Sequence, residues 1–306
     1  MRKILYITAI IFLFSSSLKA QDERDIWSRK GKVALNSGDS TLALECYLKA
    51  IELKPFTPFD HLKAISLLTQ KDDYVIAVEL IKDVLSMGYH FESIEKKQLH
   101  GLKNSTHWSS LQLVKDSIRD TYEKSIDQEY VKLLENMVYM DQEIRKPYMK
   151  SLQDSLLKEK TLFAMELVDS LNFNNLMRQT KSKGFPNYNS VGYLGVNNAW
   201  LILWHHRGEY ETNPNWQEIK PYIEKEIAEG KLPKDFLAMF LDYNEIEHDR
   251  PIIYGTIYGY YRGQPEYDKL KVINRETLNQ RRAEIGLAPI ELWLKSMNLP
   301  MPKTLN

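Results

Sequence analysis

Residues 24–57 read RDIWSRKGKVALNSGDSTLALECYLKAIELKPFT, and this stretch decides the expected fold. Gly38 and Asp39 separate two segments whose apolar residues recur at helical spacing, and Pro55 is expected to end the second helix. The second segment has a broad apolar face made of Leu42, Ala43, Leu44, Tyr47, Ala50, Ile51 and Leu53. The stretch therefore predicts two helices packed against each other as a hairpin.

The large and small side chains of this hairpin follow a definite spacing: Trp27, Gly31, Gly38, Ala43, Tyr47, Ala50 and Pro55. In this spacing the stretch resembles a tetratricopeptide repeat, a unit of 34 residues built from two helices. Small residues at Gly31 and Ala43 are expected to let the helices approach closely, with Trp27 and Tyr47 beside them. The resemblance implies a module that holds other proteins or peptides.

A second unit continues at the same period, because Ala77 follows Ala43, and Ile81 follows Tyr47, by 34 residues. One repeat cannot bury its own apolar face, so neighbouring hairpins are needed to close the core. A third hairpin is expected from Phe91, Leu99, Leu102, Trp108, Leu111 and Val114. Two uses of the array remain open: a groove for a peptide or protein partner, or a cap packed against the C-terminal domain.

The first twenty residues have the composition of a secretory signal peptide. Arg2 and Lys3 are followed by an apolar run of 11 residues from Ile4 to Phe14 and by a small polar stretch ending at Ala20. Such a run is shorter than the ~20 residues of a membrane-spanning helix. We therefore expect residues 1–20 to be cleaved, leaving an exported, periplasmic or extracellular protein without a stable membrane anchor. An uncleaved N-terminal anchor is the alternative.

The charge balance argues against two classes of partner. The chain has 41 basic and 41 acidic residues, and removal of Arg2, Lys3 and Lys19 with the signal peptide leaves 38 basic ones. Nucleic acids and anionic lipids are held by clustered Lys and Arg, which a nearly neutral chain does not provide in excess. Neither is therefore expected as a partner, whereas a protein or peptide is.

The rest of the chain divides near Ser125. Residues 116–157 are highly charged with helical periodicity, and no glycine occurs between Gly101 and Gly184, which indicates long helices. Glycines, prolines and aromatic residues concentrate from Gly184 onward. The sequence predicts a mainly α protein: tetratricopeptide-like helical repeats over 21–125 and a compact α-rich domain over 126–306. Residues 252–261 could form a small β ribbon in this second domain.

Several motifs of the second domain occur in a characteristic order. They are Asp141-Gln142 with Arg145, Gly184-Phe185-Pro186, Val191-Gly192, residues 197–206, residues 238–242, Tyr254-Gly255-Thr256 and residues 281–287. In this order the region resembles a family of uncharacterised bacterial proteins, the domain of unknown function DUF6624. The chain departs from the family's pattern at Tyr243, Ile252 and Ile257, where an arginine and two glutamines would stand. The resemblance implies a domain boundary and no particular reaction.

His205 and His206 end an apolar helical segment that is expected to be buried. Adjacent helical positions differ by about 100°, so the two imidazoles should point to different faces and cannot both bind one metal ion. Neither a His-Glu-x-x-His nor a Cys-x-x-Cys motif is present, so no metal site and no cofactor is predicted. A purely structural histidine, favoured by the dipole at a helix C-terminus, is the alternative.

Asp242 is the carboxylate that would complete a catalytic site in this domain. If the fold brings it to His205 or His206, the pair would make a general base for hydrolysis, with Tyr254 nearby. Asp242 could equally cap a helix or pair with Arg281. The sequence therefore predicts an exported protein that binds a protein or peptide through its helical repeats. The alternative is a hydrolase-type enzyme whose site lies in the C-terminal domain.

Overall fold

The computed structural model describes residues 23–53, 57–97, 99–150 and 155–305. These residues are mainly helical, which confirms the predicted mainly α class. The expected signal peptide, residues 1–20, and the helix stop at Pro55 lie outside the described residues. Within the described ranges, every helix falls short of the length and apolar character that a membrane span requires.

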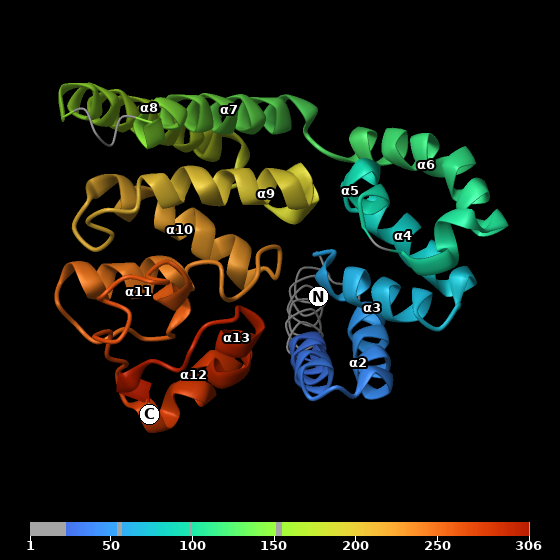
Figure 1. Cartoon of the computed structure of the whole chain (residues 1–306). Helices are drawn as coiled ribbons and strands as arrows, with labels where there is room; N and C mark the ends of the chain where they lie inside the picture. Colours follow the sequence, from blue (N-terminus) through green and yellow to red (C-terminus); the bar gives the residue numbers. More distant parts are fainter. Residues whose placement is uncertain (1–22, 54–56, 98, 151–154, 306) are drawn as a thin grey trace, which may run out of the picture.

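The N-terminal part of the chain is a succession of helices in which each packs against the next. α2 contacts α3, α3 contacts α4, and α4 contacts α6. Figure 1 shows this part, in blue to green, as an arc beside the rest of the molecule. Its elements are helical residues 23–36, α2 (Ser40–Glu52), α3 (Phe59–Thr69), α4 (Tyr74–Ser86), α5 (Phe91–Glu95), the 3-10 helix η1 (His100–Asn104) and α6 (Thr106–Ser125).

The first hairpin forms as its sequence predicts. Gly38 adopts a φ of +87° in the turn, and the Asp39 carboxylate caps α2 by accepting from the Leu42 amide at 2.9 Å. A Cβ atom at Gly31 would lie 2.8 Å from the Tyr47 ring, so only glycine fits at this helix crossing. The expected close approach at Gly31 is therefore confirmed.

The second hairpin, α3 and α4, is regular, and the third is not. α5 contains only 5 residues and is followed by η1 before the long α6. Phe91 stacks on Trp108 at 5.2 Å between ring centroids and so ties this irregular stretch to α6. Buried side chains from Ala34 to Leu111 form one continuous hydrophobic core under the three hairpins.

The C-terminal part is arranged in layers of helices around a second hydrophobic core that runs from Tyr130 to Leu305. The long hairpin of α7 and α8 covers α9, and α10 to α13 follow in further layers (Figure 1). Its elements are α7 (Gln128–Lys150), α8 (Ser155–Lys183), α9 (Tyr188–His205), α10 (Pro214–Ala228), α11 (Ala238–Glu247), η2 (Thr256–Gly259), η3 (Arg275–Thr277), α12 (Leu278–Glu284), α13 (Ile290–Ser296) and η4 (Lys303–Leu305).

The β ribbon considered for residues 252–261 does not form. Among the described residues, one parallel bridge joins Ile252 to Val272, and the 3-10 helix η2 follows. The backbone amides of Ile253 and Tyr254 donate to the Asp242 carboxylate instead of to a second strand, at 2.8 Å each. Because these donors are already bound, a ladder cannot continue through this segment.

Tyr122 of α6 joins the two parts of the molecule. A Cβ atom at Gly88 would lie 2.3 Å from the Tyr122 ring, and one at Gly192 would lie 1.8 Å from its hydroxyl. Both glycines have positive φ, and Gly192 interrupts the helical geometry of α9. The tyrosine is thus held between the turn after α4 and the bend of α9.

Candidate functional site

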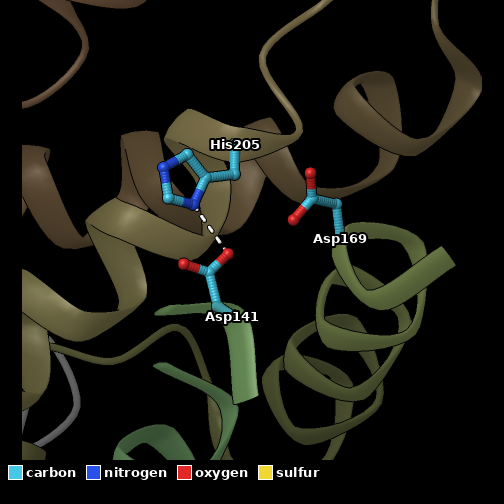
Figure 2. A group of neighbouring side chains, drawn as sticks. All are labelled: Asp141, Asp169 and His205. Atoms are coloured by element: carbon cyan, nitrogen blue, oxygen red, sulfur yellow. Dashed lines mark hydrogen bonds and ion pairs between the residues drawn. The ribbon is translucent and has the colours of Figure 1, made fainter. Parts of the chain in front are cut away.

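His205 lies at the C-terminal end of α9 and is hydrogen-bonded to an acid on α7. Its Nδ1 is 2.7 Å from Oδ1 of Asp141. Figure 2 shows the imidazole and this carboxylate facing each other, with Asp169 of α8 beside them. Asp141 is buried, with 1% of its side chain exposed, whereas the His205 side chain is 16% exposed. The pair therefore has one end in the core and one end open to solvent.

Arg145 connects this pair to the third helix. Its Nη1 donates to Asp141 Oδ1 at 2.7 Å, and its Nη2 donates to both carboxylate oxygens of Asp169 at 2.7 and 2.8 Å. Gln142 adds a hydrogen bond of 2.6 Å to Asp141 Oδ2. Asp141 and Arg145 share one face of α7 because they are four residues apart. Helices α7, α8 and α9 thus meet in one charged network.

The electrostatics of this network fix the role of each ring nitrogen. Burial acts to raise the pKa of Asp141, but the hydrogen bond and charge of His205, together with Gln142 and Arg145, outweigh it and lower that pKa. For Asp169 burial prevails, and its pKa is raised despite Arg145. An ionised Asp141 accepts the Nδ1 proton of His205, so a neutral ring presents Nε2 as a proton acceptor.

The same side chains offer one ligand atom each to a metal ion. Oxygens of Asp141 and Asp169 and a nitrogen of His205 all lie within 4.8 Å of one another. Arg145, however, already forms ion pairs with both carboxylates. A cation would have to displace this guanidinium, so the residues fit a closed ion-pair network better than a metal site.

His206 follows the last residue of α9 and packs against α8. Its ring packs on Phe173 with 4.2 Å between centroids, and its Nε2 is buried without a hydrogen-bond partner in the described structure. Burial lowers the pKa of this imidazole, because the charged form would be desolvated. His206 is therefore a neutral, half-buried side chain packed on the core.

Asp242 is fully buried and binds backbone rather than a histidine. Oδ1 accepts from the amides of Ile253 and Tyr254, and Oδ2 accepts from the amide of Thr256 at 2.6 Å and from its hydroxyl at 2.7 Å. These four bonds use the lone pairs of the carboxylate. The carboxylate beside His205 is thus that of Asp141, and the pairing of Asp242 with a histidine is corrected.

Tyr254 belongs to the turn that Asp242 holds. Its amide donates to Asp242, its carbonyl accepts from Arg282, and Arg281 donates to the preceding carbonyl of Ile253 at 3.1 Å. The predicted set is therefore divided among three places, and His206 is the one that packs on Phe173. His205 lies in the charged network, and Asp242 and Tyr254 lie in a structural turn. Asp141 and Arg145 entered the sequence reasoning only through the family resemblance, although their spacing of four is itself a signal for one helix face.

A second candidate site is a cavity of about 450 Å³ between the two hydrophobic cores. On one side it is bordered by the helix of residues 23–36 and by the start of α3, on the other by residues from α9 to α13. The lining combines aromatic rings, among them Trp200 and Trp293, with charged groups from both sides. The predicted site residues His205, His206, Asp242 and Tyr254 do not line this cavity.

Burial raises the pKa of two acids that border this cavity, Asp60 and Asp235. Asp60 is 5% exposed and accepts from the Ser28 hydroxyl at 2.7 Å, and burial raises its pKa. Burial raises the pKa of Asp235 to about 6. Asp25 is paired with Arg24 at 2.9 Å. Carboxyl groups whose pKa is raised in a concave site are typical of functional positions.

No family model matches the chain, and the same holds for curated proteins and for solved structures. The resemblances to tetratricopeptide repeats and to DUF6624 thus stay predictions from the sequence. A function for this protein has to rest on the chemistry of the charged network and of the cavity.

Proposed function

We propose that the protein is an exported binding protein that holds a small ligand or the end of a peptide in the cavity between its helical repeats and its C-terminal region. The observation that carries this proposal is the cavity itself, whose lining comes from both parts of the chain. Its volume of about 450 Å³ lies within the range of small-molecule sites and is too small for a partner helix.

The sequence left two uses open for the repeats, a groove for a partner and a cap on the C-terminal domain. The position of the cavity is compatible with both. The helix of residues 23–36 and α3 are the first helices of the first two hairpins, and both face the cavity. The opposite side is formed by the protein's own C-terminal region. The array thus acts in part as a cap, and the space that remains is the binding site.

Direct contacts support this arrangement in the absence of a ligand. Lys295 Nζ donates to the carbonyl of Asn36 at 3.3 Å. Phe59 meets Tyr193 edge to face, with 5.7 Å between the ring centroids. A cavity whose two sides are held in this way is largely formed before binding, which reduces the entropy lost on association.

The proposal is tested by filling the cavity without disturbing the core. Asn197 is an exposed residue of α9 that lines the cavity, and Asn189 is an exposed residue of the same helix that does not. Purified wild-type protein and the variants Asn197→Trp and Asn189→Trp are incubated with a tripeptide library, and retained peptides are identified by native mass spectrometry. We expect retention by the wild type and Asn189→Trp and at least ten-fold less by Asn197→Trp. Equal retention by both variants, or none by the wild type, contradicts the proposal.

A second candidate function, hydrolysis in the C-terminal region, is favoured by the hydrogen bond between Asp141 and His205. Asp141 accepts from Nδ1 and so orients the ring, which leaves Nε2 to take a proton from a water molecule that attacks a carbonyl carbon. General-base catalysis of this kind contributes about 10²–10⁴-fold to a rate.

p-Nitrophenyl acetate is a suitable probe for this second function. His205→Gln should lower the rate of its hydrolysis by about 10²-fold or more, whereas His206→Gln should change it little, since the His206 ring packs on Phe173 and its Nε2 is buried. Equal rates in wild type and His205→Gln, with both proteins folded by circular dichroism, exclude His205 as the base.

A further inference from the structure

Arg282 of α12 is a buried guanidinium at the border of the cavity. Its exposed fraction is 0%, and it belongs to the cavity lining. Nε donates to the carbonyl of Ala288 at 2.6 Å, and Nη1 donates to the carbonyl of Tyr254. Nη2 is buried and has no hydrogen-bond partner in the described part of the chain. Two of its three nitrogens are therefore bound to the protein and the third is left for something else.

The groups that accept hydrogen bonds from Arg282 are neutral backbone carbonyls, although the guanidinium itself stays charged. Burial lowers the pKa of Arg282 to about 10, which still leaves it protonated at neutral pH. The nearby acids Asp242, Glu291 and Asp235 act on it only through their charge. The carboxylate oxygens of Asp242 already accept hydrogen bonds from backbone amides and from Thr256. A buried N–H without a partner is destabilising, and more so when the group is charged. A bound anion would remove this cost.

We infer that the ligand of the cavity carries a carboxylate that accepts a hydrogen bond from Nη2 of Arg282. This inference rests on the function proposed above, because it names the chemistry of the ligand in that cavity. It draws on three observations: the burial of the guanidinium, its unpaired Nη2 and its place in the lining.

The charges around the cavity select an anion with a single negative charge. Among the described residues, four basic side chains line it and three acidic ones do: Arg24, Lys32, Lys234 and Arg282 against Asp25, Asp60 and Asp235. This described lining carries one formal positive charge in excess. A carboxylate brings this balance to zero, whereas a doubly charged phosphate would leave an excess negative charge in a partly buried space.

The aromatic rings define the rest of the ligand. Trp293 lies 5.5 Å from the Arg282 guanidinium, measured to the ring centroid, and lines the cavity together with Trp200. Indole rings beside an anion-binding group suit a molecule with one carboxylate and an apolar or aromatic body. N-acylated amino acids and the carboxyl ends of short peptides have this chemistry.

The test compares acids with their uncharged amides. A panel of N-acetyl amino acids, including N-acetylphenylalanine, and the matching C-terminal amides are titrated against the full mature chain by calorimetry. We expect the best acid to bind at least ten-fold more tightly than its amide. Arg282→Lys should reduce this preference to below two-fold. Arg281→Lys is the matched control, since Arg281 does not line the cavity and binds neighbouring carbonyls, and it should keep the preference.

A measurement on the wild-type protein guards against misfolding of the Arg282 variant. In protein labelled with ¹⁵N at arginine, the best acid should shift the guanidinium signals of Arg282 and leave those of Arg281 in place. Three results overturn the inference: equal binding of acids and amides, an unchanged Arg282 signal throughout the panel, or tighter binding of phenyl phosphate than of every acid. Retention of tripeptides by the wild type then shows whether only the carboxylate inference has failed or the cavity binds nothing.

Discussion

Nδ1 of His205 and Oδ1 of Asp141 lie 2.7 Å apart, although their residues are 64 positions apart in the chain. This hydrogen bond connects the end of α9 to the middle of α7, and Arg145 extends the connection to α8 through Asp169. The network therefore orients His205 and, at the same time, ties together three helices of the C-terminal core. Substitutions in it should report on stability as well as on chemistry.

Asp141→Asn should destabilise the protein most at neutral pH. The folded state lowers the pKa of Asp141 from its ordinary value of 3.8, so its stabilising contribution is present above about pH 4 and is lost as the pH falls through the folded value. Disrupting a buried ion pair costs about 3–5 kcal/mol, and Asn keeps part of the hydrogen bonding, so we expect a loss of about 2–4 kcal/mol at pH 7. Urea unfolding at pH 7 and pH 3 measures this difference, which should shrink at the lower pH.

Glu143→Gln is the matched control for Asp141→Asn. Glu143 lies on the same helix and pairs with Lys146 at the surface, where an ion pair is worth about 1 kcal/mol or less. If both substitutions had the same effect at pH 7, the charged network would not contribute to stability in the way its geometry indicates.

Asp235→Asn should have the opposite effect. Burial raises the pKa of Asp235 to about 6 from an ordinary value of 3.8, so this carboxyl favours the folded state below about pH 4 and progressively less as the pH rises through 6. The variant should therefore be more stable than the wild type by about 1–3 kcal/mol at pH 7.5, with a smaller gain at pH 5. Thermal melts across this range measure it. The exposed Asp116 provides the matched control, Asp116→Asn, for removal of a carboxylate outside the cavity.

Gly192→Ala should disrupt the junction between the two cores. The residue adopts a φ of +68°, and a Cβ atom there would lie 1.8 Å from the Tyr122 hydroxyl, so both the backbone and the ring would have to move. Combined strain and overpacking predict a loss of about 2–4 kcal/mol in chemical denaturation. Gly38→Ala separates backbone strain from overpacking. Gly38 has a φ of +87°, but a Cβ atom added there would meet no described atom within 4 Å. This substitution should therefore cost only about 1 kcal/mol. Equal losses at the two positions would mean that Tyr122 is not tightly held.

His206→Phe should remove part of the acid sensitivity of the fold. Burial lowers the pKa of His206 below its ordinary value of 6.5, so protonation favours the unfolded chain and stability is lost as the pH falls below about 6.5. Phenylalanine has no nitrogen to leave unpaired against Phe173. We expect the variant to match the wild type within about 1.5 kcal/mol at pH 8 and to be the more stable protein at pH 5. The exposed residue His90, changed to Phe, is the matched control for the loss of an imidazole.

The features that the sequence predicts correctly are those set by neighbouring residues. Gly38 and Asp39 specify a turn and a helix cap within a few positions, and both take these roles. The absence of glycine between Gly101 and Gly184 favours long helices, and α6, α7 and α8 are the longest ones described.

The features that the sequence does not predict depend on contacts between distant segments. Nothing near His205 indicates that its carboxylate partner is Asp141, because that depends on how α7 crosses α9. Likewise, the tyrosines and glycines of residues 252–261 are compatible with a β ribbon. The ribbon is absent because the carboxylate of Asp242 accepts hydrogen bonds from the backbone amides that a second strand would need. The cavity is harder still to predict from the sequence, because its lining residues are spread along the chain from Arg24 to Trp293.

The cavity also links the folding of the two parts of the chain. Each part has its own hydrophobic core, and a molecule in the cavity touches helices that belong to both. Its binding energy would then be lost when either part unfolds. A protein that melts in two steps when empty would melt in one step, at a higher temperature, when saturated.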